Sequence, residues 1–172
     1  MREMLPSATR AGLIVNPRGA AAQLQIGAFQ DAARALGLSL QIFRVSSVQD
    51  FDAAFTEASR QSARFLVVGA DPLFTSRVEQ LATLALRHGL PTVYHSRDFA
   101  MTGGLISYGG STLDAQRLAG TYVGRILKGE RAAELPVQQL TKVEMVLNLK
   151  TAKSLGIVVP LSLLGRADEV IK

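Results

Sequence analysis

The sequence predicts an α/β fold in which helices cover both faces of a mostly parallel sheet, a three-layer doubly wound arrangement. Short apolar runs alternate with segments of helical periodicity along the chain of 172 residues. The run at 65–70 is apolar without alternation, which is typical of a central parallel strand. Capping and turn residues separate the runs, so each strand is expected to lead into a helix and a right-handed crossover.

The first half of the chain contains three pairs of a strand and a helix. We expect strands at 11–15, 38–45 and 65–70, followed by helices at 21–36, from 47 onward and at 72–88. The apolar faces are expected to be Leu24, Phe29, Ala32, Ala33 and Leu36 in the first helix, and Phe51, Ala54, Phe55 and Ala58 in the second. Alternation in the second strand indicates a position near an edge. Asp71 and Pro72 fit an N-cap and a first helical residue, while Gly37 and Gly89 fit helix ends.

The second half continues the pattern and contains the longest helix. Strands are expected at 91–96, 104–109 and 143–149, helices at 113–128 and 150–156, and a short amphipathic end within the tail 157–172. Ser111 and Asp114 form a capping box for the long helix, which ends at Gly129. Asn148 or Leu149 begins the short helix.

Composition excludes several classes of function. The net charge is +5, from 19 Lys and Arg against 14 Asp and Glu, and it is spread thinly, so a nucleic-acid partner is not expected. The chain has no cysteine, which excludes disulfides and thiolate chemistry but leaves the redox compartment open. No apolar run reaches the roughly 18 residues of a membrane span, and residues 1–10 lack the apolar region of a secretory signal.

Polar residues follow several predicted strands, at the edge where open α/β sheets bind ligands. These candidate site residues are Asn16, Asp71, Ser96, Arg97, Asp98 and Tyr108. Each also has a purely structural interpretation. Asp71 can cap a helix, contact a ligand or do both, and Asn16 before Pro17 can form an Asx turn. The segment 96–98 can be a solvated loop, and Tyr108 can pack where the sheet ends.

The chemistry of an enzyme is not found in the sequence. The turn at 16–22 has a single glycine and no phosphate-binding pattern. A phosphoacceptor site would need carboxylates at Asn16-Pro17. The two histidines, His88 and His95, lack metal-ligand spacing, and G-x-S-x-G is absent. We therefore expect no catalytic residues, no metal and no cofactor.

Several motifs resemble one family in combination. They are SYG at 107–109, YVGRILKG at 122–129, LPVQQ at 135–139 and LNLKTAKSLG at 147–156, with LIVNP at 13–17, ADPLF at 70–74 and LPTVYHSRDF at 90–99. This combination resembles the ABC transporter substrate-binding proteins that include tryptophan- and tyrosine-type binders. The resemblance implies the type I periplasmic-binding fold, with residues 1–172 as a single C-terminal lobe. By this resemblance the chain begins where the second lobe starts, without the export signal and the first lobe.

The resemblance also implies a function and a site. The function is binding of a small organic solute such as an amino acid in a cleft between two lobes, delivery to a membrane permease, and a periplasmic location. The implied contacts are Asn16 with Pro17, Asp71 with Ala70 and Phe74, Ser96, Arg97 and Asp98, and Tyr108. Asp71 is expected to bind the amine, and Phe74 to form an apolar wall.

The helix at 111–130 is the crossover that would pack on the absent lobe. Its apolar face, with Leu118, Tyr122, Val123 and Ile126, then lacks a partner, and exposed apolar faces favour association. We expect this helix to pack on another copy, giving a homo-oligomer through 111–128, or to fold back on its own sheet.

Other functions remain open at this stage. The same fold serves as the sensor module of regulators, although the chain shows no helix-turn-helix or kinase segment. A flavodoxin-like enzyme is a second alternative, against which the missing motifs argue. A truncated or engineered half without a transport role is a third. The sequence does not identify the solute.

Overall fold

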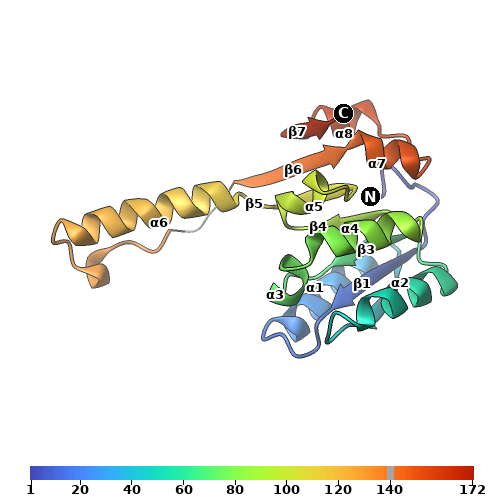
Figure 1. Cartoon of the computed structure of the whole chain (residues 1–172), viewed down its shortest axis with the longest axis horizontal. Helices are drawn as coiled ribbons and strands as arrows, with labels where there is room; N and C mark the ends of the chain where they lie inside the picture. The colour runs from blue at the N-terminus through green and yellow to red at the C-terminus, as the bar shows by residue number, and fades with distance from the viewer. Residues whose placement is uncertain (139–141) are drawn as a thin grey trace.

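The computed structural model describes residues 1–138 and 142–172, whose centre is one seven-stranded sheet (Figure 1). Its strands are β1 Arg10–Val15, β2 Ser39–Arg44, β3 Phe65–Val68, β4 Thr92–Tyr94, β5 Ile106–Gly110, β6 Val143–Asn148 and β7 Glu169–Ile171. They lie in the order β2-β1-β3-β4-β5-β6-β7, with β2 at an edge as predicted. Strands β1 to β5 pair in parallel, so the predicted α/β fold is confirmed.

Strand β6 reverses the direction of the sheet. It pairs antiparallel to β5, with Val143 opposite Gly110 and Leu147 opposite Ile106. Strand β7, which the sequence pattern left within the tail, then pairs in parallel with β6. The chain therefore leaves the sheet at the end of β5 and re-enters it beside the same point.

The helices follow the strands in the predicted alternation. They are α1 Ala22–Ala35, α2 Asp50–Arg60, α3 Pro72–Thr75, α4 Val78–Arg87, α5 Arg97–Met101, α6 Thr112–Leu127, α7 Leu149–Ser154 and α8 Leu161–Leu164, with a 3-10 turn η1 at Ala132–Glu134. Three predicted caps are confirmed by backbone N–H groups that donate to the side chains of Asp71, Ser111 and Asn148. Gly37 and Gly129 adopt positive φ where α1 and α6 end.

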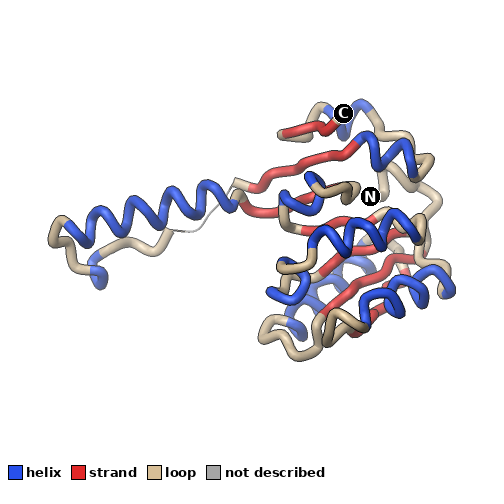
Figure 2. The backbone as a smooth tube through the Cα atoms, viewed as in Figure 1, coloured by secondary structure: helices blue, strands red, loops and turns tan. Residues whose placement is uncertain are grey.

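The two faces of the sheet bury different sets of side chains. On one face, Phe51 and Phe55 of α2 and Leu81 of α4 pack with Leu66 of β3, as the predicted stripe of α2 requires. The other face is covered by α1 (Figure 2), and there Ile26 packs with Leu13 and Val15 of β1. Right-handed crossovers explain the division. The connection from β1 to β2 runs along the sheet in one direction, and the connections from β2 through to β5 run in the other, so their helices lie on opposite faces.

Three local expectations are wrong. Leu24 and Leu36 of the predicted α1 face are 79% and 52% exposed. Of the predicted face only Ala33 is buried, and it lies on a stripe with Ala22 and Ile26. The predicted helix 72–88 is two helices, because the chain turns at Ser76 and Arg77. The segment after β4 forms the short helix α5 rather than a loop.

Helix α6 projects from the sheet as an arm, and residues that follow it run back alongside (Figure 1). None of its residues is buried. Leu118 and Tyr122 are half-buried, and the Tyr122 hydroxyl donates to the carbonyl of Pro136. Val123 and Ile126 are exposed. The predicted apolar face is thus divided, and in this structure the helix does not fold back on its own sheet. The motif residue Gln139 lies outside the described residues.

The stability of the folded chain is expected to fall as the pH decreases from 7 to 5. Desolvation lowers the pKa of both His88 and His95. Just below pH 6.5 the unfolded chain therefore binds more protons than the folded chain, which favours unfolding. Glu57 does not contribute in this range. A hydrogen bond from Arg60 is the main reason that the pKa of Glu57 is lowered from 4.5 to about 2. The ionised Glu57 side chain therefore stabilises the folded chain, and this contribution declines only as the pH falls below about 4.5.

Urea unfolding at pH 7 and pH 5 measures this loss. A variant with His88→Gln and His95→Gln is expected to lose less stability between the two pH values. Equal losses in the variant and the unmodified chain would contradict the assignment to the histidines.

Candidate functional site

The predicted site residues follow the carboxyl ends of the parallel strands, which form one rim of the sheet. Asn16 and Pro17 follow β1, Ala70 and Asp71 follow β3, Ser96, Arg97 and Asp98 follow β4, and Tyr108 lies in β5. Since β1, β3, β4 and β5 are parallel neighbours, these residues share one edge of the sheet. They nevertheless divide into separate groups on that edge.

Asn16 and Asp71 are in direct contact, although 55 residues separate them. The Asn16 side chain donates from Nδ2 to Asp71 Oδ1 at 3.0 Å. Its Oδ1 accepts from the backbone N–H of Arg18 at 3.0 Å, which is the Asx turn that the sequence allowed. The Asp71 Oδ1 also accepts from the N–H of Leu73 at 2.9 Å. The structural interpretations of both residues are therefore correct, and the two loops are joined at the rim.

The second carboxylate oxygen of Asp71 lies next to Gly19. Among the described residues, Asp71 Oδ2 accepts no hydrogen bond by the usual distance and angle limits. A Cβ added to Gly19 would come within 2.5 Å of it. A half-buried carboxylate can accept hydrogen bonds from several donors. Here Oδ1 accepts the two hydrogen bonds that hold the loop, and Oδ2 can accept further hydrogen bonds.

Gln25 of α1 fixes the loop that carries Asp71, and sequence reasoning missed it. Its Oε1 accepts from the N–H of Ala70 at 2.7 Å, and its Nε2 donates to the carbonyl of Ala70 at 3.0 Å. Gly69 permits this approach, since a Cβ there would lie 2.6 Å from Gln25 Oε1. One signal was available: Gln25 lies next to Ala22 and Ile26 on the stripe of α1 that faces the sheet.

Replacement of Gln25 by leucine is expected to loosen this loop. Two hydrogen bonds to Ala70 are lost, which we expect to cost about 1–2 kcal/mol of unfolding free energy, because the exposed backbone groups can bind water instead. Hydrogen exchange at the N–H of Ala70 should become faster in the variant. Gln23→Leu, on the exposed side of the same helix, is the control. Unchanged exchange at Ala70 would show that Gln25 does not hold the loop.

Two hollows lie near the rim. The larger, of about 1050 Å³, is lined by Ala70 and Tyr108 at the rim and continues along the face of the sheet that carries α1. The smaller, of about 410 Å³, is lined by Ser96, Arg97 and Asp98. His95 lines both. The predicted residues of β4 and its loop are thus beside a different hollow from Ala70 and Tyr108.

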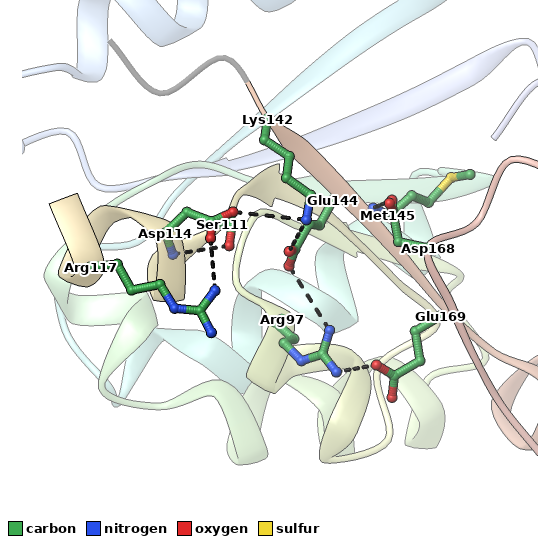
Figure 3. A network of polar contacts seen from close by, with 9 residues as sticks. All are labelled: Arg97, Ser111, Asp114, Arg117, Lys142, Glu144, Met145, Asp168 and Glu169. Carbon is green, nitrogen blue, oxygen red and sulfur yellow. Dashed lines mark hydrogen bonds and ion pairs between the residues drawn. The ribbon is translucent and has the colours of Figure 1, made fainter. Parts of the chain in front are cut away.

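Arg97 is engaged by acidic partners from the last strands. Its guanidinium forms an ion pair with Glu169 of β7 and lies 4.0 Å from Glu144 of β6 (Figure 3). Glu144 in turn lies 3.5 Å from Lys142, at the base of the α6 arm. These contacts tie α5 to the edge of the sheet, so Arg97 already has carboxylate partners within its own chain.

Phe74 lies in the hydrophobic core behind the rim. Its side chain is fully buried, and its ring centroid is 5.8 Å from that of Phe51. It therefore stabilises the turn after β3 and does not reach the surface of the rim. Pro17, by contrast, is exposed.

A buried tyrosine supports the same turn. The Tyr94 hydroxyl is hydrogen-bonded to Thr75 Oγ1 at 2.8 Å. Burial raises the pKa of Tyr94, and the charge of Asp71 adds to this, while the hydrogen bond to Thr75 acts in the opposite direction. A neutral hydroxyl therefore stands behind the Asp71 carboxylate at physiological pH.

The Asp71 carboxylate is an acidic group that hydrogen bonds fix at the rim. In residues 1–138 and 142–172, no group of three or more His, Cys, Asp or Glu side chains could hold a metal ion. No helix in that part of the chain is long and apolar enough to cross a membrane. Asp71 lines neither hollow, although its neighbour Ala70 lines the larger one. A fixed carboxylate at this position can hold a cationic group of a small ligand.

Several solved structures of bacterial proteins have a fold similar to that of this chain. A conserved domain protein from Vibrio cholerae matches 98% of this chain with a TM-score of 0.87 and 23% identity. An ABC domain in complex with L-Trp from Streptococcus pneumoniae matches 99% with a TM-score of 0.87 and 24% identity. An open, ligand-free substrate-binding protein with adhesive properties from Clostridium difficile matches 99% with a TM-score of 0.72 and 18% identity. In each case the chain spans 57% of the other protein.

The family comparison covers almost the whole chain. A search of curated protein sequences gives no match. The family model described as ABC transporter substrate binding protein matches residues 1–171. Together with the fold, this match means that the chain belongs to the ABC transporter substrate-binding protein family.

Proposed function

We propose that this lobe binds a small organic solute, an amino acid being the favoured class, at the rim that carries Asn16 and Asp71. The observation that carries the proposal is the Asp71 carboxylate, of which one oxygen is fixed by the loop and the other has unused capacity. A carboxylate held in this way is suited to an ammonium group, because the hydrogen bond is charge-assisted. The family supports the class of function, since its members bind substrates for ABC transporters.

The remaining contacts follow from the hollow that begins at the rim. Tyr108 is 58% exposed and lines this hollow together with Ala70, so its ring can form an apolar wall for the solute. Exposed backbone N–H groups in the loops can hold a carboxylate. Ser96 and Asp98, on the smaller hollow, are proposed to contact the more distant part of the solute.

The proposed transport role uses a second lobe and a membrane permease. A single rim covers one side of a solute, whereas binding sites usually bury most of their ligand, so closure of two lobes by a hinge would complete the site. The closed form would present the solute to a membrane permease. This contact would take place on the outer side of the cytoplasmic membrane, in the periplasm or the extracellular space. No bond is made or broken in this cycle, so no catalytic residue is proposed.

A thermal-shift screen with amino acids tests the proposal. A ligand that binds the folded lobe but not the unfolded chain raises the midpoint of thermal unfolding. At 100 times its dissociation constant, such a ligand raises the free energy of unfolding by about 2.7 kcal/mol. L-Tryptophan is the first probe, and 3-indolepropionate, which lacks the α-amino group, is its matched control. Stabilisation by the amino acid and not by the control is expected. Equal shifts with both compounds would remove the proposed amine contact, and no shift with any amino acid would remove the proposal that this lobe by itself binds an amino acid.

A further inference from the structure

His95 lies between the two hollows of the rim, although it was not among the candidate site residues. It follows β4 directly, and it lines both the larger hollow, with Ala70 and Tyr108, and the smaller hollow, with Ser96. In the described part of the chain, no other residue lines both hollows. A solute that binds at this rim and extends from one hollow towards the other therefore passes His95.

Packing fixes the position of His95. Its ring lies edge-on to the buried ring of Tyr94, with the two ring centroids 4.3 Å apart. Its backbone lies so close to β5 that a Cβ added to Gly109 would come within 2.3 Å of the His95 carbonyl oxygen. Contacts with β4 and β5 thus hold the imidazole at the rim without engaging its nitrogen atoms.

The nitrogen atoms of the His95 ring are available to a ligand. The side chain is exposed, and within residues 1–138 and 142–172 neither ring nitrogen forms a hydrogen bond. The surrounding protein atoms still desolvate the ring enough to lower the pKa of His95. The imidazole is therefore neutral at pH 7, with one nitrogen that can donate a hydrogen bond and one that can accept.

Asp71 and His95 follow adjacent strands of the sheet. Strands β3 and β4 pair in parallel, and neighbouring strands lie about 4.8 Å apart. The charge of Asp71 helps to raise the pKa of Tyr94, whose ring contacts that of His95, so the carboxylate and the imidazole lie in the same part of the rim. An α-amino acid carries its ammonium and carboxylate groups on one carbon atom, and these two groups therefore need partners that are neighbours.

We propose that His95 binds the carboxylate of the amino acid whose ammonium group is held by Asp71. The inference rests on the proposed function and names the second charged contact of the same site. The ring N–H donates to a carboxylate oxygen of the solute, while Asp71 accepts from the ammonium group. The negative charge of the bound carboxylate favours the imidazolium form, so binding raises the pKa of His95. By reciprocity, protonation of His95 strengthens binding by the same factor.

The affinity for the amino acid is therefore expected to increase as the pH falls. The increase is about tenfold for each pH unit by which binding raises the pKa of His95. The other titratable or charged side chains on the elements around His95 are Asp71, Arg97, Asp98, Tyr108 and Glu144. Between about pH 7.5 and 5.5 none of these residue types changes its charge at its ordinary pKa, so the dependence on pH reports His95.

Nuclear magnetic resonance of the imidazole signals tests the contact. The chain has only two histidines, and His88, which follows α4, serves as an internal control. A pH titration with L-tryptophan is expected to show the pKa of His95 raised by about one unit, with His88 unchanged. Tryptamine, which keeps the amine but lacks the carboxylate, should not raise the pKa of His95. An equal rise with tryptamine would overturn the carboxylate contact.

Variants separate this inference from the proposed function. His95→Gln keeps a donor but cannot gain a proton, so its affinity for L-tryptophan should not change between about pH 7.5 and 5.5. His88→Gln is the matched control and should retain the pH dependence. Binding of L-tryptophan that leaves the pKa of His95 unchanged would overturn the role of His95 and leave the proposed function standing. No response to L-tryptophan would also overturn this inference, whereas the proposed function fails only if every amino acid in the thermal-shift screen fails.

Discussion

Replacement of Phe74 by alanine is expected to lower the free energy of unfolding by about 3–5 kcal/mol, the largest effect of any single change considered for this chain. The Phe74 side chain is fully buried and packs against Phe51 among residues of α2, α4 and β3. Its removal leaves a cavity behind the rim that the surrounding helices cannot fill. Urea unfolding followed by circular dichroism measures the loss.

A second variant separates this interpretation from the ligand-wall role that the family resemblance implied for Phe74. Phe74→Leu keeps most of the buried volume and should cost clearly less than the alanine variant. If Phe74 lined the ligand site instead, the alanine variant would unfold at nearly the same urea concentration and would lose only the response to solutes. That outcome would contradict its placement in the core.

Replacement of Asp71 by alanine is expected to reduce both stability and solute binding. The N-cap of α3 and the hydrogen bond to Asn16 are lost, which should cost about 1–2 kcal/mol of unfolding free energy. Loss of a charge-assisted hydrogen bond to a ligand amine, at about 1.5–3 kcal/mol, corresponds to about a 10- to 150-fold weaker affinity. Calorimetric titration with the amino acid selected by thermal shift measures the second effect.

Two variants separate the cap from the ligand contact. Asp71→Asn retains a capping oxygen and should recover most of the stability, yet it lacks the charge and should bind weakly. Gly19→Ala leaves the carboxylate intact but places a methyl group where it would come within 2.5 Å of Asp71 Oδ2, so it should weaken binding through that oxygen. Normal affinity in both variants would exclude Asp71 as the amine contact.

The elements of the fold could be predicted because their signals are local. Asp71 before Pro72, Ser111 before Asp114, and the glycines after α1 and α6 specify helix ends within a few residues of sequence, and the structure has each of them. The parallel sheet followed from the alternation of strands and helices. The inward side of α1 could not be predicted in the same way, because apolar residues occur on two adjacent stripes and contact with β1 selects only one.

The candidate site was predicted as a set of positions but not as a set of contacts. Asn16 and Asp71 were both expected at the rim, and their hydrogen bond follows from the neighbouring positions of β1 and β3. Gln25 was missed because its partner, Ala70, is 45 residues away. The engagement of Arg97 by Glu169 was missed because β7 had no recognisable strand pattern.

The amino-acid sequence by itself determined the class of fold, most of the helix ends and the family, because periodicity, capping and motifs are encoded in neighbouring residues. The tertiary structure alone decided which polar groups meet at the rim, that Phe74 belongs to the core, and that no residue of α6 is buried within the described part of the chain. Those outcomes depend on strand order and crossover handedness, which bring together side chains that no local pattern relates.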